Sequence, residues 1–227
     1  MRSILLALPL TLLAAPAAAQ QMDEQLWFQA NGAVEVSARD KVTLESVGRF
    51  SDRAGGFFHA ELGVLFTHRT RGGVELSVGY RHVEEWDHGV REPSEERLRQ
   101  MVVVPLGGGF NTRLRFEQRF SSAGSEMGFR LRPRLGFETP LNRRGLKLVA
   151  TNEHFFNLNG TAWGVTGGYD RMRNTLGVSI PLGEGVRGEA GYLNQYRFGR
   201  NGARDRMDHA ATFTLSFTIA RPGRTAD

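Results

Sequence analysis

The fold is decided by one stretch of sequence, Phe110-Asn111-Thr112-Arg113-Leu114-Arg115-Phe116-Glu117-Gln118-Arg119-Phe120. Large apolar residues alternate in it with polar or charged ones. Because successive side chains of a β-strand point to opposite faces, the stretch has one apolar face and one charged face. The same alternation recurs along most of the chain. This repetition is typical of a closed barrel with an apolar outside and a polar inside.

Working outward from this stretch, the alternation predicts eleven strands. They cover residues 25–36, 41–50, 57–70, 74–82, 95–104, 110–120, 126–138, 146–155, 169–182, 185–197 and 207–219. Most are long enough to cross the apolar band of an outer membrane, which takes roughly nine residues or more in a tilted strand. We therefore predict an all-β fold, a single antiparallel transmembrane β-barrel of about 10–12 strands with a lumen rich in Arg and Glu.

The strand count has an open point at the amino end. Short and long links alternate along the chain and give ten strands from Val42 onward. The segment 25–36 then has the wrong parity for a barrel with an even number of antiparallel strands. Either this segment closes the barrel by another route, or residues 161–169 hold a further strand.

Composition narrows the class of protein. The chain has 227 residues, enough for one domain, and 40% of them are hydrophobic. The absence of cysteine excludes a disulfide scaffold and a thiolate metal site. The formal net charge is +5, but the basic residues alternate along strands with nearby Glu instead of forming basic runs. We therefore expect no nucleic-acid partner.

The amino end has the features of a secretory signal peptide. Arg2 supplies the positive start, residues 4–15 form an apolar core, and residues 17–19 are alanines before Gln20. An anchoring transmembrane helix is the alternative, and the short, proline-containing core argues against it. We predict that residues 1–19 are cleaved and that residues 20–227 form a barrel domain in the outer membrane of a Gram-negative bacterium. The expected partners are outer-membrane lipid and lipopolysaccharide, with barrel-assembly machinery and periplasmic chaperones during biogenesis, around a monomer.

The inward face of the predicted barrel carries a charge network. Its members are Arg97, Arg99, Arg113, Arg115, Glu117, Arg119, Arg130, Arg132, Arg134 and Glu153. Between residues 95 and 153, nine Arg or Lys and five Glu share this face, so the wall has a net positive charge. One interpretation is a narrow passage for small anionic solutes, since rings of Arg or Lys select for anions. The other is a small barrel stapled internally by salt bridges.

Hairpin registers test this face assignment. If Val104 and Phe110 both face outward, the numbers of partner residues sum to 214. The pairs are then Glu95 with Arg119, Arg97 with Glu117, and Arg99 with Arg115. The next hairpin places Glu117 beside Arg130, and the one after it places Glu153 opposite Arg130 or Arg132. Opposite charges therefore meet in a register chosen from apolar residues alone.

The enzyme alternative is an outer-membrane lipid-modifying hydrolase, which needs a Ser–His pair within hydrogen-bond reach. A register with partners summing to 144 places His59 opposite Glu85 and Ser77 opposite Thr67, too far apart to couple. Histidines and acids in the loop near residues 82–88 could bind a divalent cation, although such clusters are commonly solvated. We assign no catalytic, cofactor-binding or metal residue and predict a non-enzymatic protein. A closed envelope scaffold whose loops bind partners is a further alternative.

An ordered series of short motifs runs along the chain. The motifs are Trp27, Leu76-Ser77-Val78-Gly79-Tyr80, Glu96-Arg97-Leu98-Arg99-Gln100, Leu114-Arg115-Phe116-Glu117-Gln118-Arg119, Arg130-Leu131-Arg132-Pro133-Arg134-Leu135, Asn152-Glu153-His154-Phe155-Phe156, Gly168-Tyr169-Asp170-Arg171-Met172-Arg173 and Glu189-Ala190-Gly191-Tyr192-Leu193-Asn194-Gln195. In this series the chain resembles a family of bacterial outer-membrane β-barrels catalogued as domain of unknown function 2490. The resemblance implies a secreted outer-membrane barrel and brings no established activity, ligand or catalytic residue.

Overall fold

The structure is a computed structural model, and it describes residues 21–200 and 202–220. The predicted signal peptide, residues 1–19, lies outside this part of the chain. No helix long and apolar enough to cross a membrane occurs among the described residues. Their regular structure consists of β-strands, as the alternating sequence predicts.

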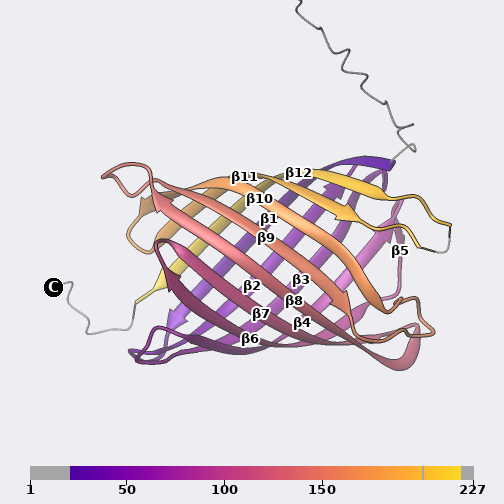
Figure 1. Cartoon of the computed structure of the whole chain (residues 1–227), viewed down its shortest axis with the longest axis horizontal. Helices are drawn as coiled ribbons and strands as arrows, with labels where there is room; N and C mark the ends of the chain where they lie inside the picture. The colour runs from indigo at the N-terminus through magenta and orange to yellow at the C-terminus, as the bar shows by residue number, and fades with distance from the viewer. Residues whose placement is uncertain (1–20, 201, 221–227) are drawn as a thin grey trace, which may run out of the picture.

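Twelve strands make up the described structure (Figure 1). They are β1 (Gln21–Glu35), β2 (Asp40–Ser51), β3 (Gly56–Arg69), β4 (Glu75–Asp87), β5 (Val90–Arg91), β6 (Glu95–Gly107), β7 (Phe110–Ser121), β8 (Gly124–Pro140), β9 (Lys147–Asn157), β10 (Gly168–Gly183), β11 (Val186–Arg197) and β12 (Arg206–Ile219). Each of the eleven predicted strands is confirmed. The two-residue β5, which pairs only with the end of β4, was not predicted.

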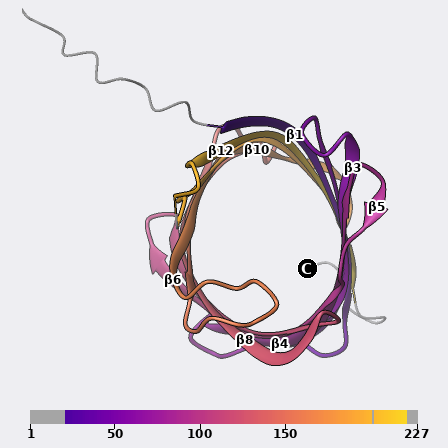
Figure 2. The same cartoon turned by 90° about the vertical axis from the view of Figure 1, so that its right-hand side faces the viewer.

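The sheet closes on itself into a barrel of eleven strands, with β5 outside the count (Figure 2). Neighbours are antiparallel at every seam among the described strands except one, where β1 runs parallel to β12. The prediction of a wholly antiparallel barrel is wrong at this seam. An odd number of strands with alternating directions must place two parallel strands side by side. This closure also resolves the parity of the first segment, since residues 161–167 hold no strand.

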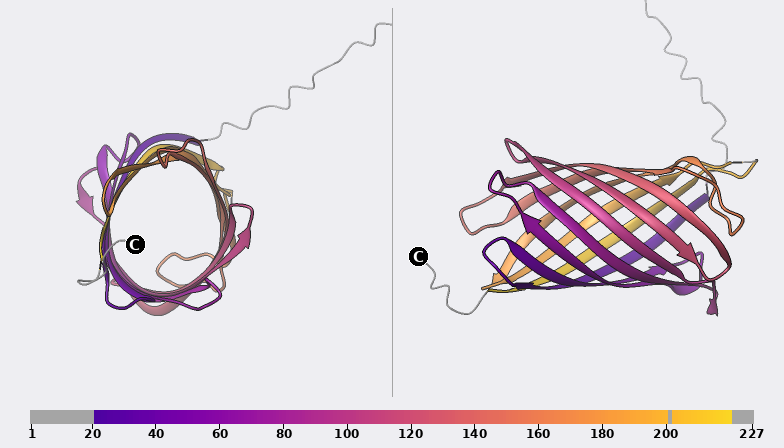
Figure 3. Two further views of the ribbon diagram at one scale, coloured as in Figure 1. Left: turned by 90° about the vertical axis from the view of Figure 1, so that its left-hand side faces the viewer. Right: turned by 90° about the horizontal axis from the view of Figure 1, so that it is seen from below.

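Polarity is inverted relative to a water-soluble domain. The largest fully buried side chains among the described residues include Arg99, Glu117, Gln195 and Asp208. Large apolar side chains lie on the outer surface, and Leu62 and Leu44 are 64% and 62% exposed. The polar positions of the strands therefore face the interior of the barrel, and the large apolar positions face its outer surface. The left view of Figure 3 shows the ring of strands end-on.

Aromatic rings form a belt on the outer face near one end of the barrel. Phe28 stacks on Phe213 at a centroid distance of 5.7 Å and meets the edge of Phe50 at 6.3 Å. The series continues through Phe57, 5.3 Å from Phe50, to Trp86, 5.1 Å from Phe57. A belt of this kind is typical of β-barrels at a membrane–water interface, where amphipathic rings are favoured.

The turn between β6 and β7 corrects one predicted register. Gly107, Gly108 and Gly109 all have positive φ, between 58° and 86°, and a Cβ on Gly109 would lie 2.3 Å from the Glu138 carbonyl oxygen. These glycines make a tighter turn than predicted, so partner numbers sum to 216, and Arg99 lies opposite Glu117. The predicted sum of 214 is wrong by two residues. A shift of two preserves the faces, because side chains alternate with period two.

Of the two registers predicted for Glu117 and Glu153, the first is confirmed and the second is wrong. Glu117 lies opposite Arg130, as predicted. Glu153 lies opposite Arg134, not opposite Arg130 or Arg132. The link between β8 and β9 is responsible, because Pro140 pairs with Lys147, so partner numbers sum to 287 and not to the 283 or 285 of the predicted pairs.

Candidate functional site: a charge lattice inside the barrel

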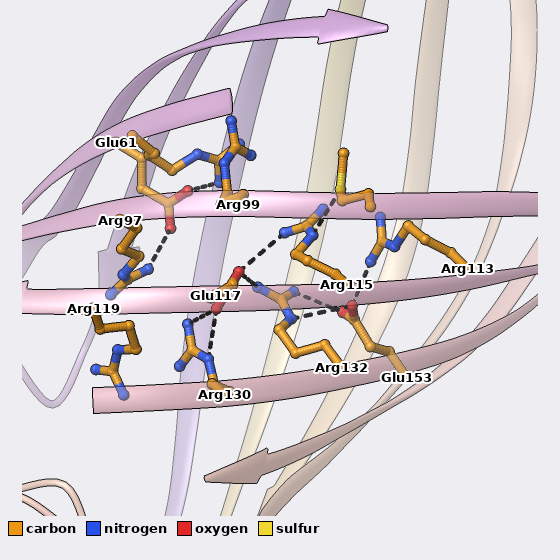
Figure 4. Close-up of polar contacts among 12 residues, drawn as sticks. Glu61, Arg97, Arg99, Arg113, Arg115, Glu117, Arg119, Arg130, Arg132 and Glu153 are labelled. Carbon is orange, nitrogen blue, oxygen red and sulfur yellow. Dashed lines mark hydrogen bonds and ion pairs between the residues drawn. The ribbon is translucent and has the colours of Figure 1, made fainter. Parts of the chain in front are cut away.

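The ten residues of the predicted network all lie on four adjacent strands of the inner wall, and Figure 4 labels all of them except Arg134. Strand β6 carries Arg97 and Arg99, β7 carries Arg113, Arg115, Glu117 and Arg119, β8 carries Arg130, Arg132 and Arg134, and β9 carries Glu153. Alternation places them inward because each occupies every second position of its strand. Their lumen location follows the sequence pattern, and their ion pairs follow from the registers.

Glu117 is the centre of the lattice. Its side chain is 1% exposed, and it accepts hydrogen bonds from Arg130 Nε at 2.6 Å and Arg132 Nη1 at 2.8 Å. Arg115 Nη1 is a more distant donor, at 3.5 Å. One carboxylate thus holds guanidinium groups from two neighbouring strands. Charge-assisted hydrogen bonds of this kind are among the strongest in proteins.

Glu153 is a second centre, joined to the first through Arg132. Arg132 donates to it from Nε at 3.2 Å and from Nη2 at 2.9 Å, a bidentate arrangement. Arg113 also donates to Glu153, and Arg173 lies 3.9 Å away. Since Arg132 contacts both Glu117 and Glu153, the two centres form a single network across β7, β8 and β9.

A third centre, not predicted from the sequence, lies on β3. Glu61 pairs with Arg49 at 3.2 Å, with Arg97 at 3.7 Å and with Arg81. Glu45 on β2 extends this centre, because it pairs with Arg81 at 2.9 Å and with Arg99. Each of these residues occupies an inward position of an alternating strand, so the period-two pattern could have identified them. That pattern does not show which strands each ion pair joins.

Two inward aromatic rings, which were not predicted as part of the network, carry stacked guanidinium groups. Arg49 lies 4.0 Å and Arg173 lies 4.7 Å from the centroid of Trp27. Arg132 lies 4.2 Å from the centroid of Phe155, which is 2% exposed. Cation–π contacts of this type are stronger when desolvated, and guanidinium groups make them readily. The rings therefore support arginines that the carboxylates leave only partly paired.

Beside the lattice lies a cavity of about 900 Å³, which we call the vestibule. Its lining begins at the rim where β1 ends and β2 begins, at Ser37, Arg39 and Asp40, and it reaches inward to Arg119 and Arg171. The lining contains fifteen Arg or Lys and nine Asp or Glu, which leaves an excess of six positive charges. An enclosed surface with this imbalance attracts anions.

The connection between β9 and β10, residues 158–167, projects over part of the opposite mouth of the barrel. Trp163 donates from its indole nitrogen to the Glu126 carbonyl at 2.7 Å, and Arg119 lies 5.3 Å from its ring centroid. Val165 is 8% exposed, although it belongs to a loop. Figure 2 shows this orange loop turned in over the mouth of the barrel. Together with the lattice, the loop constricts the lumen at this end.

The side-chain contacts of His59 differ from those of a histidine that activates a serine nucleophile. His59 Nε2 lies 2.7 Å from Glu61, and Nδ1 lies 3.0 Å from Glu85. Ser77 Oγ lies 2.9 Å from Thr67 Oγ1, on the register predicted for it. Both ring nitrogens of His59 thus meet carboxylates. Within residues 21–200 and 202–220, no group of three or more His, Cys, Asp or Glu side chains is arranged to hold a metal ion.

These features define the chain as a closed β-barrel with an apolar exterior and an interior lined by an arginine–glutamate lattice. It belongs to the family described as protein of unknown function (DUF2490), whose model matches residues 24–207. The family resemblance predicted from the motifs is therefore confirmed.

A relative is found in Methylorubrum extorquens, as an uncharacterized protein. The two sequences are 41% identical over 128 residues. This aligned stretch covers 53% of the present chain and 55% of the relative, so the chain matches about half the length of that protein.

Proposed function

We propose that this protein is a non-enzymatic outer-membrane β-barrel of a Gram-negative bacterium whose lumen is held closed by its own charge lattice. The inverted polarity carries the proposal. A continuous apolar surface around a whole barrel would promote aggregation in water. In a bilayer the same surface meets acyl chains, and the backbone hydrogen bonds are all satisfied between strands.

The aromatic belt and the turns suggest an orientation. Trp86 and Phe57 lie at the end of the barrel that carries the loop 158–167, while the two-residue turns at 108–109 and 184–185 lie at the other end. Short turns are typical of the periplasmic side of bacterial barrels. We therefore place the vestibule rim in the periplasm and the loop 158–167 outside. Lipid and lipopolysaccharide would surround a monomer that assembly machinery inserts after residues 1–19 are removed.

The lattice supports a structural role for the lumen side chains. Contacts such as Arg99 with Glu45 join strands β6 and β2, which are not neighbours in the sheet, and so brace the wall across the interior. Ion pairs that are desolvated and share several hydrogen bonds hold a defined geometry, because removal of one partner leaves a buried charge. Together with the loop over the mouth, this packing opposes free diffusion through the barrel. A pore open at rest is therefore the less favoured alternative.

Membrane fractionation combined with gel migration tests the proposal. The expressed full-length chain should appear in the outer-membrane fraction, and unheated samples should migrate differently from heated ones, because a closed barrel resists detergent unfolding until it is heated. A control on the same gel is outer-membrane material boiled in detergent before loading. Recovery of the folded protein in the soluble periplasmic fraction would contradict the proposed location.

A further inference from the structure

The lattice holds more guanidinium groups than its carboxylates can pair. Five arginines share Glu117 and Glu153, namely Arg113, Arg115, Arg130, Arg132 and Arg173. Arg134, beside them on β8, forms no ion pair with any carboxylate of the described residues, and its polar contact is with Asn111 Oδ1 at 3.3 Å. A buried, incompletely paired cation is costly, so this part of the wall favours an added negative charge.

The cross-strand registers concentrate the excess of guanidinium groups at one place. Arg113 lies directly opposite Arg134, and Arg115 directly opposite Arg132. Like charges facing each other across a strand pair are destabilising. Arg115 is 7% exposed, and its Nε donates to the sulfur of Met101, a weak acceptor. Its closest carboxylate contact is the long one to Glu117.

The same barrel shows how such a pair is neutralised elsewhere. Arg97 also lies opposite another arginine, Arg119. There Glu95 lies between the two, accepting from Arg97 Nε at 2.9 Å and from Arg119 Nη2 at 2.6 Å. No carboxylate of the described chain contacts both Arg113 and Arg134 in this way. Their Nε atoms are buried and have no hydrogen-bond acceptor among the described residues.

This incompletely neutralised pair faces the vestibule. Arg113, Arg115 and Arg134 all line the cavity. Between them and the rim, the lining is rich in hydroxyl groups, including those of Thr43, Ser77, Thr151, Thr175, Thr214 and Ser216. A cavity of about 900 Å³ has room for a ligand larger than a simple ion. Hydroxyl side chains both donate and accept, so they suit the polar body of such a ligand.

We propose that the vestibule binds a small multivalent anion, whose phosphate or carboxylate group lies between Arg113 and Arg134 with Arg115 as a third contact. The ligand would occupy the place that Glu95 takes between Arg97 and Arg119. Guanidinium groups recognise both phosphate and carboxylate by paired N–H donors, so the two share one site chemistry. The inference deepens the proposed function, since it takes the barrel as a folded membrane protein and adds what its lumen binds.

Titration calorimetry on the purified barrel in neutral detergent tests the site with two probes, pyrophosphate and citrate. We expect saturable binding of at least one probe to the wild-type protein, and the stronger binder identifies phosphate or carboxylate as the favoured group. Arg134→Gln should weaken this binding about tenfold, the loss of one charge-assisted contact. Arg115→Gln should weaken it as well. Arg144→Gln, the same change at an exposed turn position outside the vestibule, should bind like the wild type.

The midpoint of thermal unfolding, measured without a probe, shows whether each variant is folded. Arg134→Gln removes an unpaired charge, so the midpoint of the free barrel should not fall, while its rise on adding probe should be smaller than that of the wild type. Folded wild-type protein, verified by its heat-dependent gel shift, that binds neither probe would overturn the anion site and leave the proposed barrel intact. Wild-type affinity in Arg134→Gln would equally overturn it. Failure of the gel shift and of membrane recovery would instead count against the proposed function.

Discussion

Glutamine in place of Glu117 is expected to destabilise the folded barrel by about 3–5 kcal/mol, the range found when one partner of a buried ion pair is removed. The substitution keeps the shape of the side chain and removes its charge. Arg130 and Arg132 then lose their shared carboxylate, at 2.6 Å and 2.8 Å, inside a wall that already carries excess positive charge. Glutamine keeps one acceptor oxygen of the two and replaces the other with an NH2 donor, which leaves the guanidinium groups incompletely paired.

Urea unfolding in lipid vesicles, followed by tryptophan fluorescence, measures this loss. Glu184→Gln is the matched control, since it is the same chemical change at an exposed turn position, and it should shift the free energy of unfolding by less than about 0.5 kcal/mol. The double variant Glu117→Gln with Arg130→Gln should recover part of the loss, because the two groups interact directly. Equal stability of Glu117→Gln and the wild type would show that the lattice does not hold the barrel.

Arginine in place of Leu114 should destabilise the membrane-inserted barrel by roughly 2–4 kcal/mol, the range for Arg or Lys near the bilayer midplane. Leu114 lies at the middle of β7, is 47% exposed on the outer face and has no polar neighbour opposite it on β6, where Val102 is its partner. A guanidinium group placed there enters the acyl-chain region without a counter-ion. The expected loss is among the largest for an exposed position.

The control is a Leu→Arg substitution at a position close to the membrane interface. Leu141 is 50% exposed in the turn after β8, and the cost of Arg near the interface falls to roughly 0–1 kcal/mol. Unfolding in vesicles should therefore rank Leu114→Arg well below Leu141→Arg, which should resemble the wild type. If both variants were as stable as the wild type, the outer face would not be in contact with lipid.

Much of the fold could be predicted because the signal has period two. In residues 110–120 the large apolar residues Phe110, Leu114, Phe116 and Phe120 all occupy even positions, which identifies a strand and both of its faces without any knowledge of its partner. The predicted faces remained correct although the β6–β7 register was wrong, because a shift of two residues keeps each side chain on the same face.

The contacts between charges needed information that no local pattern holds. Glu153 meets Arg132 and Arg113 because the turn between β8 and β9 sets their register. Glu45 on β2 meets Arg99 on β6, 54 residues further along the chain, so this contact depends on the combined registers of the hairpins through β3 and β4. The parallel seam between β1 and β12 depends on closure of the barrel, so alternation could indicate a parity problem there but not its solution.

The central claim is that alternate residues of each strand face lipid and an enclosed polar interior. Because the chain has no cysteine, single cysteines can report on neighbouring positions of β9. Thr151 lines the vestibule, whereas Ala150 points to the outer face. A charged maleimide applied to broken outer membranes should label Thr151→Cys and should label Ala150→Cys only after denaturation. Rapid labelling of Ala150→Cys in the same broken membranes before denaturation, with Thr151→Cys protected, would contradict the claim.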